Sequence, residues 1–112
     1  MRLRLALLLA LAVAGCVTPR EGRMPEFVGR PIRMQAANGA VTMLMLHPDG
    51  TVEARFNGKT TAGRWDFDGG KLCFAWREGT YRECWPHRAP FRPGRTEPVH
   101  SDRGNDVRVT LE

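Results

Sequence analysis

The stretch 71-KLCFAWREGTYRECW-85 decides the fold, because its turn and its two cysteines specify the same strand pairing. Alternating segments flank Glu78-Gly79, and this dipeptide at the centre of a two-residue turn sets the register of a β-hairpin. In that register Cys73 lies directly opposite Cys84, at a Cα spacing that a disulfide allows. The stretch therefore predicts an antiparallel hairpin closed by a Cys73–Cys84 disulfide. In the chain-entropy model such a bridge contributes on the order of 3 kcal/mol.

The same register divides the side chains of the hairpin between two faces. Cys73 and Cys84 share one face with small and polar residues. The other face should point to the core, because it carries the large apolar side chains. Glu83 is the one charged residue on this second face, so we expect it either at the rim of the core or paired with an arginine. The apolar residues expected on the core-facing side are Leu72, Phe74, Trp76, Tyr81 and Trp85.

Turn signals recur at short intervals before this hairpin. Asn38-Gly39 and Asn57-Gly58 are two-residue hairpin signals, and 47-HPDG-50 fits a type I turn with a bulge. Between the turns apolar and polar residues alternate, as in 51-TVEARF-56, which is typical of a half-buried strand. The expected strands are residues 27–35, 41–46, 51–56, 59–67, 71–76, 81–85 and 107–111.

Prolines mark the exceptions to this pattern. Gly29 and Pro31 interrupt the first segment, which we therefore expect to be an edge strand. Residues 86–98 contain four prolines and cannot pair as a central strand, so a long loop is expected there. The predicted fold is all-β: one small antiparallel meander of about seven strands curled into a barrel, since closure removes exposed strand edges.

Residues 1–16 have the features of a signal peptide followed by an acylated cysteine. Arg2 and Arg4 precede an apolar run at residues 5–14, which is too short to remain as a membrane-spanning helix. The run ends in Val13-Ala14-Gly15-Cys16, which resembles the lipobox of bacterial prolipoproteins. The resemblance implies cleavage before Cys16, acylation of its thiol and of the new amine, and permanent attachment to an envelope membrane. An ordinary secretory signal beside a chance cysteine is the alternative.

The lipobox resemblance also divides the chain and implies its destination. Residues 1–15 would be the signal peptide, residues 16–25 the lipidated N-terminus and tether, and residues 26–112 a single β domain. Val17 is not the aspartate that tends to hold lipoproteins in the inner membrane. We therefore expect the protein in the outer membrane, facing the periplasm, with the membrane as a partner through the N-terminal lipid.

The charge balance of the 112-residue chain excludes one class of partner. It has 17 Lys and Arg against 12 Asp and Glu, a formal net charge of +5. Loss of Arg2 and Arg4 with the signal lowers this to +3. Such a mildly basic surface lacks the clustered Lys and Arg of nucleic-acid-binding proteins, so we expect no nucleic-acid partner.

Two groups of reactive residue types are weak candidates for chemistry. Structural zinc usually takes ligands in close pairs, and among Cys73, Cys84, His87 and His100 only the middle two are close. His100-Ser101-Asp102 holds the residue types of a hydrolase triad, but consecutive residues of an extended chain point to alternate faces. A polar turn is expected there instead. The sequence thus predicts no metal, no cofactor, no catalytic residue and no enzymatic activity.

Two other features are candidates for binding. The proline-rich loop carries three arginines that would suit an anionic partner, such as a lipid headgroup or a glycan, and a solvated loop is the alternative. These candidate anion-binding residues are Arg88, Arg92 and Arg95. The three tryptophans either fill the core or line an open pocket. They are Trp65, Trp76 and Trp85.

The strand segments resemble two kinds of envelope protein. One is a group of small proteobacterial envelope proteins with a barrel-like domain, matched by Asp49-Gly50-Thr51, Gly63-Arg64-Trp65, Leu72-Cys73 and Cys84. Ala62-Gly63-Arg64 and Phe74-Ala75-Trp76 are similar to strands of the membrane-bound inhibitors of c-type lysozyme, whose cysteine near the start of the mature domain is absent here. Because the sequence shows no nucleophile–base set and no metal cluster, we expect a non-catalytic binding or structural module of the envelope, with an anionic lipid, a glycan or an envelope protein as its partner. An inhibitor of an envelope-attacking enzyme such as lysozyme is the alternative.

Overall fold

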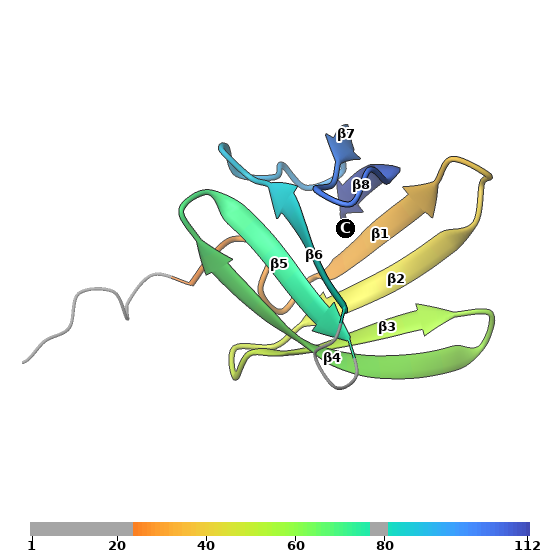
Figure 1. The fold of residues 1–112 in the computed structure, drawn as a ribbon, viewed down its shortest axis with the longest axis horizontal. Helices are drawn as coiled ribbons and strands as arrows, with labels where there is room; N and C mark the ends of the chain where they lie inside the picture. The colour runs from red at the N-terminus through yellow and green to blue at the C-terminus, as the bar shows by residue number, and fades with distance from the viewer. Residues whose placement is uncertain (1–23, 77–80) are drawn as a thin grey trace, which may run out of the picture.

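The computed structural model describes residues 24–76 and 81–112, which form an all-β domain of eight strands. The strands form one antiparallel sheet in the order β6-β5-β4-β3-β2-β1-β8-β7. The sheet curls until β6 and β7 approach each other, so that it nearly closes into a barrel (Figure 1). The expected antiparallel meander is therefore confirmed. The strands are β1 Pro31–Ala36, β2 Val41–Leu46, β3 Thr51–Phe56, β4 Lys59–Asp68, β5 Lys71–Trp76, β6 Tyr81–Pro86, β7 Thr96–His100 and β8 Asp106–Leu111.

The β5–β6 hairpin has the register that the sequence predicts. Trp76 pairs with Tyr81, and Cys73 pairs with Cys84, to which it is bonded through a disulfide. The expected turn at Glu78-Gly79 falls in residues 77–80, outside the described part of the chain. Leu72, Phe74 and Trp85 are buried as expected, whereas Tyr81 at the end of the hairpin is exposed.

Two of the three predicted turns are found in the neighbouring hairpins. Asn38-Gly39 is not a two-residue turn: the N–H of Ala36 donates to the carbonyl of Ala40, which leaves residues 37–39 in the loop, and Gly39 but not Asn38 has positive φ. Asn57 and Gly58 both have positive φ, of 52° and 75°, which matches the two-residue turn that favours Asn-Gly. In the β2–β3 connection the N–H of Gly50 donates to the carbonyl of His47, and that of His47 donates to the carbonyl of Thr51. The carboxylate of Asp49 accepts hydrogen bonds from both the amide and the hydroxyl of Thr51. These donors lower the pKa of Asp49.

The first strand is not an edge strand, contrary to the sequence prediction. β1 lies between β2 and β8, and it forms ladders with both. The prediction was wrong because neither residue interrupts the strand. Gly29 lies before β1, and Pro31 is its first residue, where the missing N–H removes no hydrogen bond from the interior of a ladder. The Pro31 carbonyl instead accepts the N–H of Glu112.

The predicted loop 86–98 is also shorter than expected. Residues 96–98 belong to β7, which raises the number of strands to eight. Pro98 pairs with Arg108 of β8 on one side, and on its other side β7 forms no ladder with any of the described strands. An edge strand accepts a proline because the lost donor does not face a partner strand.

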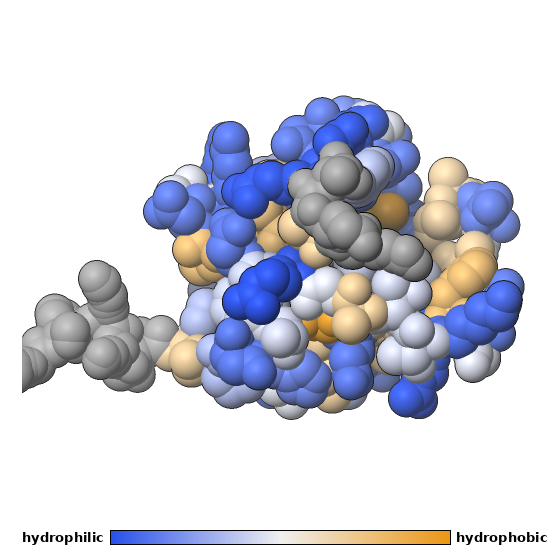
Figure 2. All heavy atoms as spheres, turned by 60° about the horizontal axis from the view of Figure 1, so that its bottom comes forward, coloured by the Kyte–Doolittle hydropathy of each residue, from blue (hydrophilic) through white to orange (hydrophobic). Residues whose placement is uncertain are grey.

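The core is made of inward side chains from both halves of the curled sheet. Phe27 is fully buried and packs edge-on against Trp65, Phe67 and His87 at ring-centroid distances of 5.6, 5.6 and 5.4 Å. The outward residues of β3 and β4 are mainly polar, and the face that carries these strands is largely hydrophilic (Figure 2). The buried apolar cluster comprises Phe27, Ile32, Leu44, Leu46, Val52, Leu72, Phe74, Trp85, Phe91, Val99, Val109 and Leu111.

The two ends of the barrel differ. The plugged end, as we call it, holds Phe27, His87 and Phe91 together with the turns at 47–50 and 69–70. The open end holds the connections at 37–40, 57–58 and 101–105. Odd-numbered strands run from the plugged end to the open end, as β1, β3 and β5 do in Figure 1. The described chain enters at the plugged end, because residues 24–26 lead directly into Phe27.

A loop completes the barrel where β6 and β7 fail to form a ladder. The N–H of Cys84 donates to Oδ1 of Asp102 at 2.9 Å, and the N–H of Asp102 donates to the Cys84 carbonyl at 3.0 Å. Both backbone groups of Cys84 thus point away from β5, as they do in a non-hydrogen-bonded pair. Arg103 Nε also donates to the carbonyl of Arg82 at 2.8 Å. We call these contacts the seam.

Candidate binding pocket at the open end

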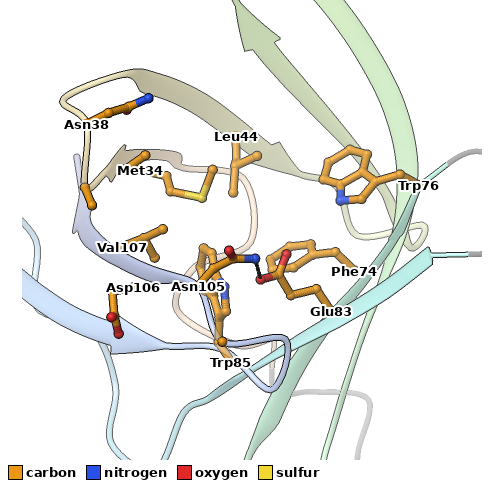
Figure 3. Close-up of a pocket in the computed structure, with 13 residues that line it drawn as sticks. Met34, Asn38, Leu44, Phe74, Trp76, Glu83, Trp85, Asn105, Asp106 and Val107 are labelled. Atoms are coloured by element: carbon orange, nitrogen blue, oxygen red, sulfur yellow. Dashed lines mark hydrogen bonds between the residues drawn. The ribbon is translucent and has the colours of Figure 1, made fainter.

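A pocket of about 590 Å³ occupies the open end of the barrel. Its walls come from β1 and β2 on one side and from β5 and β6 on the other, and the seam loop with the start of β8 completes the rim (Figure 3). This volume lies within the range of sites that hold small organic ligands. The pocket therefore joins segments that are far apart in the sequence.

The walls of the pocket are apolar and largely aromatic. Met34 and Leu44 face Phe74 and Trp76 across it (Figure 3). Phe74 and Trp76 are nearly parallel, with an interplanar angle of 14° and centroids 6.2 Å apart. Trp85 lies edge-on to Phe74 at 4.9 Å and forms part of the buried floor.

The three tryptophans have different roles, so both expectations for them are partly correct. Trp85 is 3% exposed and belongs to the core, while its edge also lines the pocket. Trp76 is half-buried and forms the pocket wall. Trp65 packs against the core near the plugged end, where its indole N–H donates to the His47 carbonyl at 2.8 Å.

The rim of the pocket is polar and acidic. Glu83 and Asp106 supply carboxylates, and Asn38 and Asn105 supply amides. Glu83 lies at the rim, the first of the two positions expected for it, and its Oε2 accepts a hydrogen bond from Asn105 Nδ2 at 2.7 Å. Oδ1 of Asp106 lies 2.6 Å from Nδ1 of His100. None of the described residues that line the pocket is Lys or Arg.

The candidate anion-binding arginines lie elsewhere. Arg88, Arg92 and Arg95 are exposed on the loop of the plugged end, and Arg95 Nε is 3.9 Å from Oε2 of Glu97. The loop is fixed from inside by His87 and Phe91, which are both buried. The structure thus separates the arginines from the pocket by the length of the barrel.

A buried polar contact that the sequence did not indicate holds this loop. Nε2 of His87 lies 2.8 Å from Oε2 of Glu26, and the same oxygen accepts the N–H of Phe91 at 2.9 Å. The only hint in the sequence is the position of Glu26 next to an apolar residue, which is too common to be a signal. Sequence reasoning therefore missed the main anchor of the plugged end.

The sequence candidates for metal binding and catalysis are dispersed. His87 lies at the plugged end, whereas His100 is exposed beside Asp106 near the open end. Within residues 24–76 and 81–112 no group of three or more His, Cys, Asp or Glu is placed to hold a metal ion. Ser101 is 1% exposed, and its hydroxyl accepts the N–H groups of Arg103 and Asn105. The expected polar turn is therefore confirmed.

Cys16 and the whole signal segment lie outside the described residues. In the part of the chain that is described, no helix has the length and apolarity needed to cross a bilayer. Searches of protein-family models, curated proteins and solved structures gave no significant match.

Proposed function

We propose that this chain is a lipid-anchored lipoprotein of the bacterial outer membrane, facing the periplasm, and acts as a non-catalytic binding module. The open-end pocket would be its ligand site. The observation that carries this proposal is the arrangement of the two ends. The chain enters at the plugged end, and an aromatic pocket of about 590 Å³ opens at the other. A lipid at Cys16 would therefore leave the pocket facing away from the membrane.

The length of the tether supports this orientation. Eight peptide bonds separate Cys16 from Met24, and a fully extended chain of that length spans at most about 28 Å. The plugged end would thus stay near the lipid headgroups. Arg88 and Arg92 are exposed at this end, where anionic headgroups would be their partner.

The anchor is tested by the intact mass of the protein purified from bacterial membranes. We expect the mass of the chain from Cys16 to Glu112 plus diacylglycerol and an amide-linked acyl chain. A Cys16→Ala variant should lack the added lipid, while a Cys73→Ala/Cys84→Ala variant should retain it. An unmodified Cys16 in the mature protein would refute the anchor.

The orientation has its own test. A fluorophore is attached to Asn38→Cys at the open end or to Asp68→Cys at the plugged end, in lipid-anchored protein on bilayers with nitroxide-labelled headgroups. We expect stronger quenching at position 68, because that end would lie next to the bilayer. Equal quenching at both positions would contradict the proposed orientation. This comparison is made on anionic bilayers at low salt, because exposed ionic contacts are screened over about 8 Å at physiological ionic strength. Replacement of Arg88, Arg92 and Arg95 by Gln should then reduce the difference in quenching between the two positions.

Inhibition of an envelope-attacking enzyme such as lysozyme is a second candidate, favoured by one observation. The rim carboxylates of Glu83 and Asp106 would complement a cationic enzyme, although the chain as a whole is basic. The purified protein at equimolar ratio should then abolish lysis of a peptidoglycan suspension. Full lysis at tenfold excess of the protein would remove this candidate.

A further inference from the structure

We propose that the open-end pocket selects an organic cation, a protonated amine carried on an apolar body. The inference rests on the proposed function of this pocket as the ligand site and adds the chemical class of the ligand. It is carried by three observations: an oriented carboxylate, an aromatic wall and the placement of the nearby arginines.

The oriented carboxylate is Glu83. It lies on the aromatic face of β6, opposite Phe74 of β5, so its carboxylate stands at the rim of the pocket beside Phe74 and Asn105 (Figure 3). The amide of Asn105 donates to its Oε2, while the contact of Oε1 within the described residues is a long one, 3.5 Å from the Tyr81 hydroxyl. An ionised carboxylate offers about four acceptor sites, so Glu83 keeps the capacity to accept a further donor. A protonated amine supplies both the donor and the opposite charge.

The aromatic wall suits the same ligand. Trp76 presents the type of ring that attracts a cation most strongly, and the interaction strengthens when the cation is removed from water. Met34 and Leu44 form the opposite wall, where the apolar body of the ligand would pack. An amine on an apolar body can therefore contact a carboxylate, an aromatic face and an apolar wall at once.

Two described arginines next to the pocket rim, Arg82 and Arg103, are engaged elsewhere. Arg82 Nη1 is 3.1 Å from the carboxylate of Asp66, and the guanidinium of Arg103 lies 4.4 Å from the centre of the Tyr81 ring. An anionic ligand would meet Glu83 and Asp106 without a lining Lys or Arg among the described residues. A neutral ligand would leave the charge of Glu83 without a counter-charge. The pocket therefore favours a cation over both alternatives.

The test compares three probes with the same hexyl tail: hexylammonium, heptanoate and 1-hexanol. The full lipidated protein is placed in zwitterionic nanodiscs and labelled with 5-fluorotryptophan, which gives one ¹⁹F resonance for each of its three tryptophans. We expect hexylammonium to bind at least tenfold more tightly than the other two probes. The resonances of Trp76 and Trp85 should shift while that of Trp65 stays in place, since Trp65 does not line this pocket.

Variants identify the carboxylate. Glu83→Gln should lower the affinity for hexylammonium at least fivefold, whereas Glu83→Asp should keep the preference for the cation. Asp68→Asn, which removes an exposed carboxylate at the plugged end, is the matched control and should bind as the wild type does. An unchanged Trp65 resonance verifies that each variant is folded.

The outcomes separate two failures. Equal binding of the three probes at Trp76 would keep the pocket as a ligand site and overturn its selectivity for cations. No shift at Trp76 with any probe would overturn the pocket itself. A further arm compares free hexylammonium with acetyl-Leu-Lys-Leu-amide. Tighter binding of the peptide assigns the amine to a lysine side chain, and tighter binding of hexylammonium assigns it to a small molecule.

Discussion

Gly63 and Trp76 lie directly opposite each other on β4 and β5, and the indole occupies the space that a side chain at position 63 would fill. A Cβ atom at Gly63 would lie 2.6 Å from Cε3 of Trp76 and 2.7 Å from the carbonyl oxygen of Ala75. The carbonyl belongs to a ladder strand and cannot move aside without disturbing the pairing of β4 with β5. The absence of a side chain at Gly63 therefore allows the indole of Trp76 to take its position in the pocket wall.

Gly63→Ala should destabilise the domain and displace Trp76. Overpacking of this kind typically costs about 1–3 kcal/mol, which chemical denaturation would measure. The ¹⁹F resonance of Trp76 should shift more than that of Trp65. Thr61→Ala, an exposed change on the same strand, should stay within about 0.5 kcal/mol. If the variant had wild-type stability and an unchanged Trp76 resonance, the close contact between Gly63 and Trp76 would not restrict the residue at position 63.

Removal of the Cys73–Cys84 disulfide should lower the free energy of unfolding by about 2–4 kcal/mol, since the bridge restricts the unfolded chain. Urea unfolding of the wild type and of the Cys73→Ala/Cys84→Ala variant would measure this. Alkylation before reduction should add no mass at these cysteines, and alkylation after reduction should add two groups. Two alkylated thiols in unreduced protein would disprove the bridge.

Asp102→Ala should open the seam, because it leaves the N–H of Cys84 without its acceptor. An unpaired, partly buried donor costs about 1–3 kcal/mol. Hydrogen exchange at the Cys84 amide should accelerate by the corresponding factor. Asp102→Asn retains a side-chain oxygen and should preserve most of the protection. Equal exchange in the wild type and the alanine variant would mean that the seam contributes nothing to closure.

Glu26→Ala should loosen the plugged end, since one carboxylate oxygen serves both His87 and the amide of Phe91. We expect a loss of about 1–3 kcal/mol in the free energy of unfolding, because both partners are left in a buried setting. Glu97→Gln removes only the exposed contact with Arg95 and should change stability by less than about 0.5 kcal/mol. Equal effects of the two substitutions would contradict the special role of Glu26.

The pKa of Asp49 should lie below its ordinary value of 3.8, because the hydroxyl and the amide of Thr51 donate to the charged carboxylate. A carboxyl whose pKa is lowered by folding stabilises the folded state above its unfolded pKa. That contribution is lost as the pH falls through the folded pKa. Thr51→Val removes the hydroxyl, so a ¹³C NMR titration of the carboxyl should show a higher pKa in this variant. A titration curve that does not move would assign the lowering to the amide alone.

The hairpin around Cys73 and Cys84 could be predicted from the sequence because its information is local. The two-residue turn expected at Glu78-Gly79 predicts a register, and the two cysteines face each other in that same register. The position of β1 could not be predicted in this way. Its second neighbour, β8, is the last strand in the sequence, and no residue near β1 in the sequence specifies that pairing.

The pocket was only partly predictable for the same reason. Glu83 on an otherwise apolar face was the local signal for its rim. Met34 and Asn105 line the pocket because the whole sheet curls, and the alternation of residues along single strands does not predict that curvature. The contact of Glu26 with His87 and Phe91 likewise joins segments that only the folded barrel brings together.

The even number of strands has a consequence for how this scaffold can be varied and used. Glu112 returns beside Pro31 and Arg30, so β8 ends at the plugged end, where the described chain also begins. The connections at 37–40 and 57–58 of the open end therefore join only strands of the sheet. Loop residues can change without altering strand register, as in antibody variable domains. A library of sequences at these two turns, with a reporter fused after Glu112, would thus diversify recognition on an otherwise constant framework.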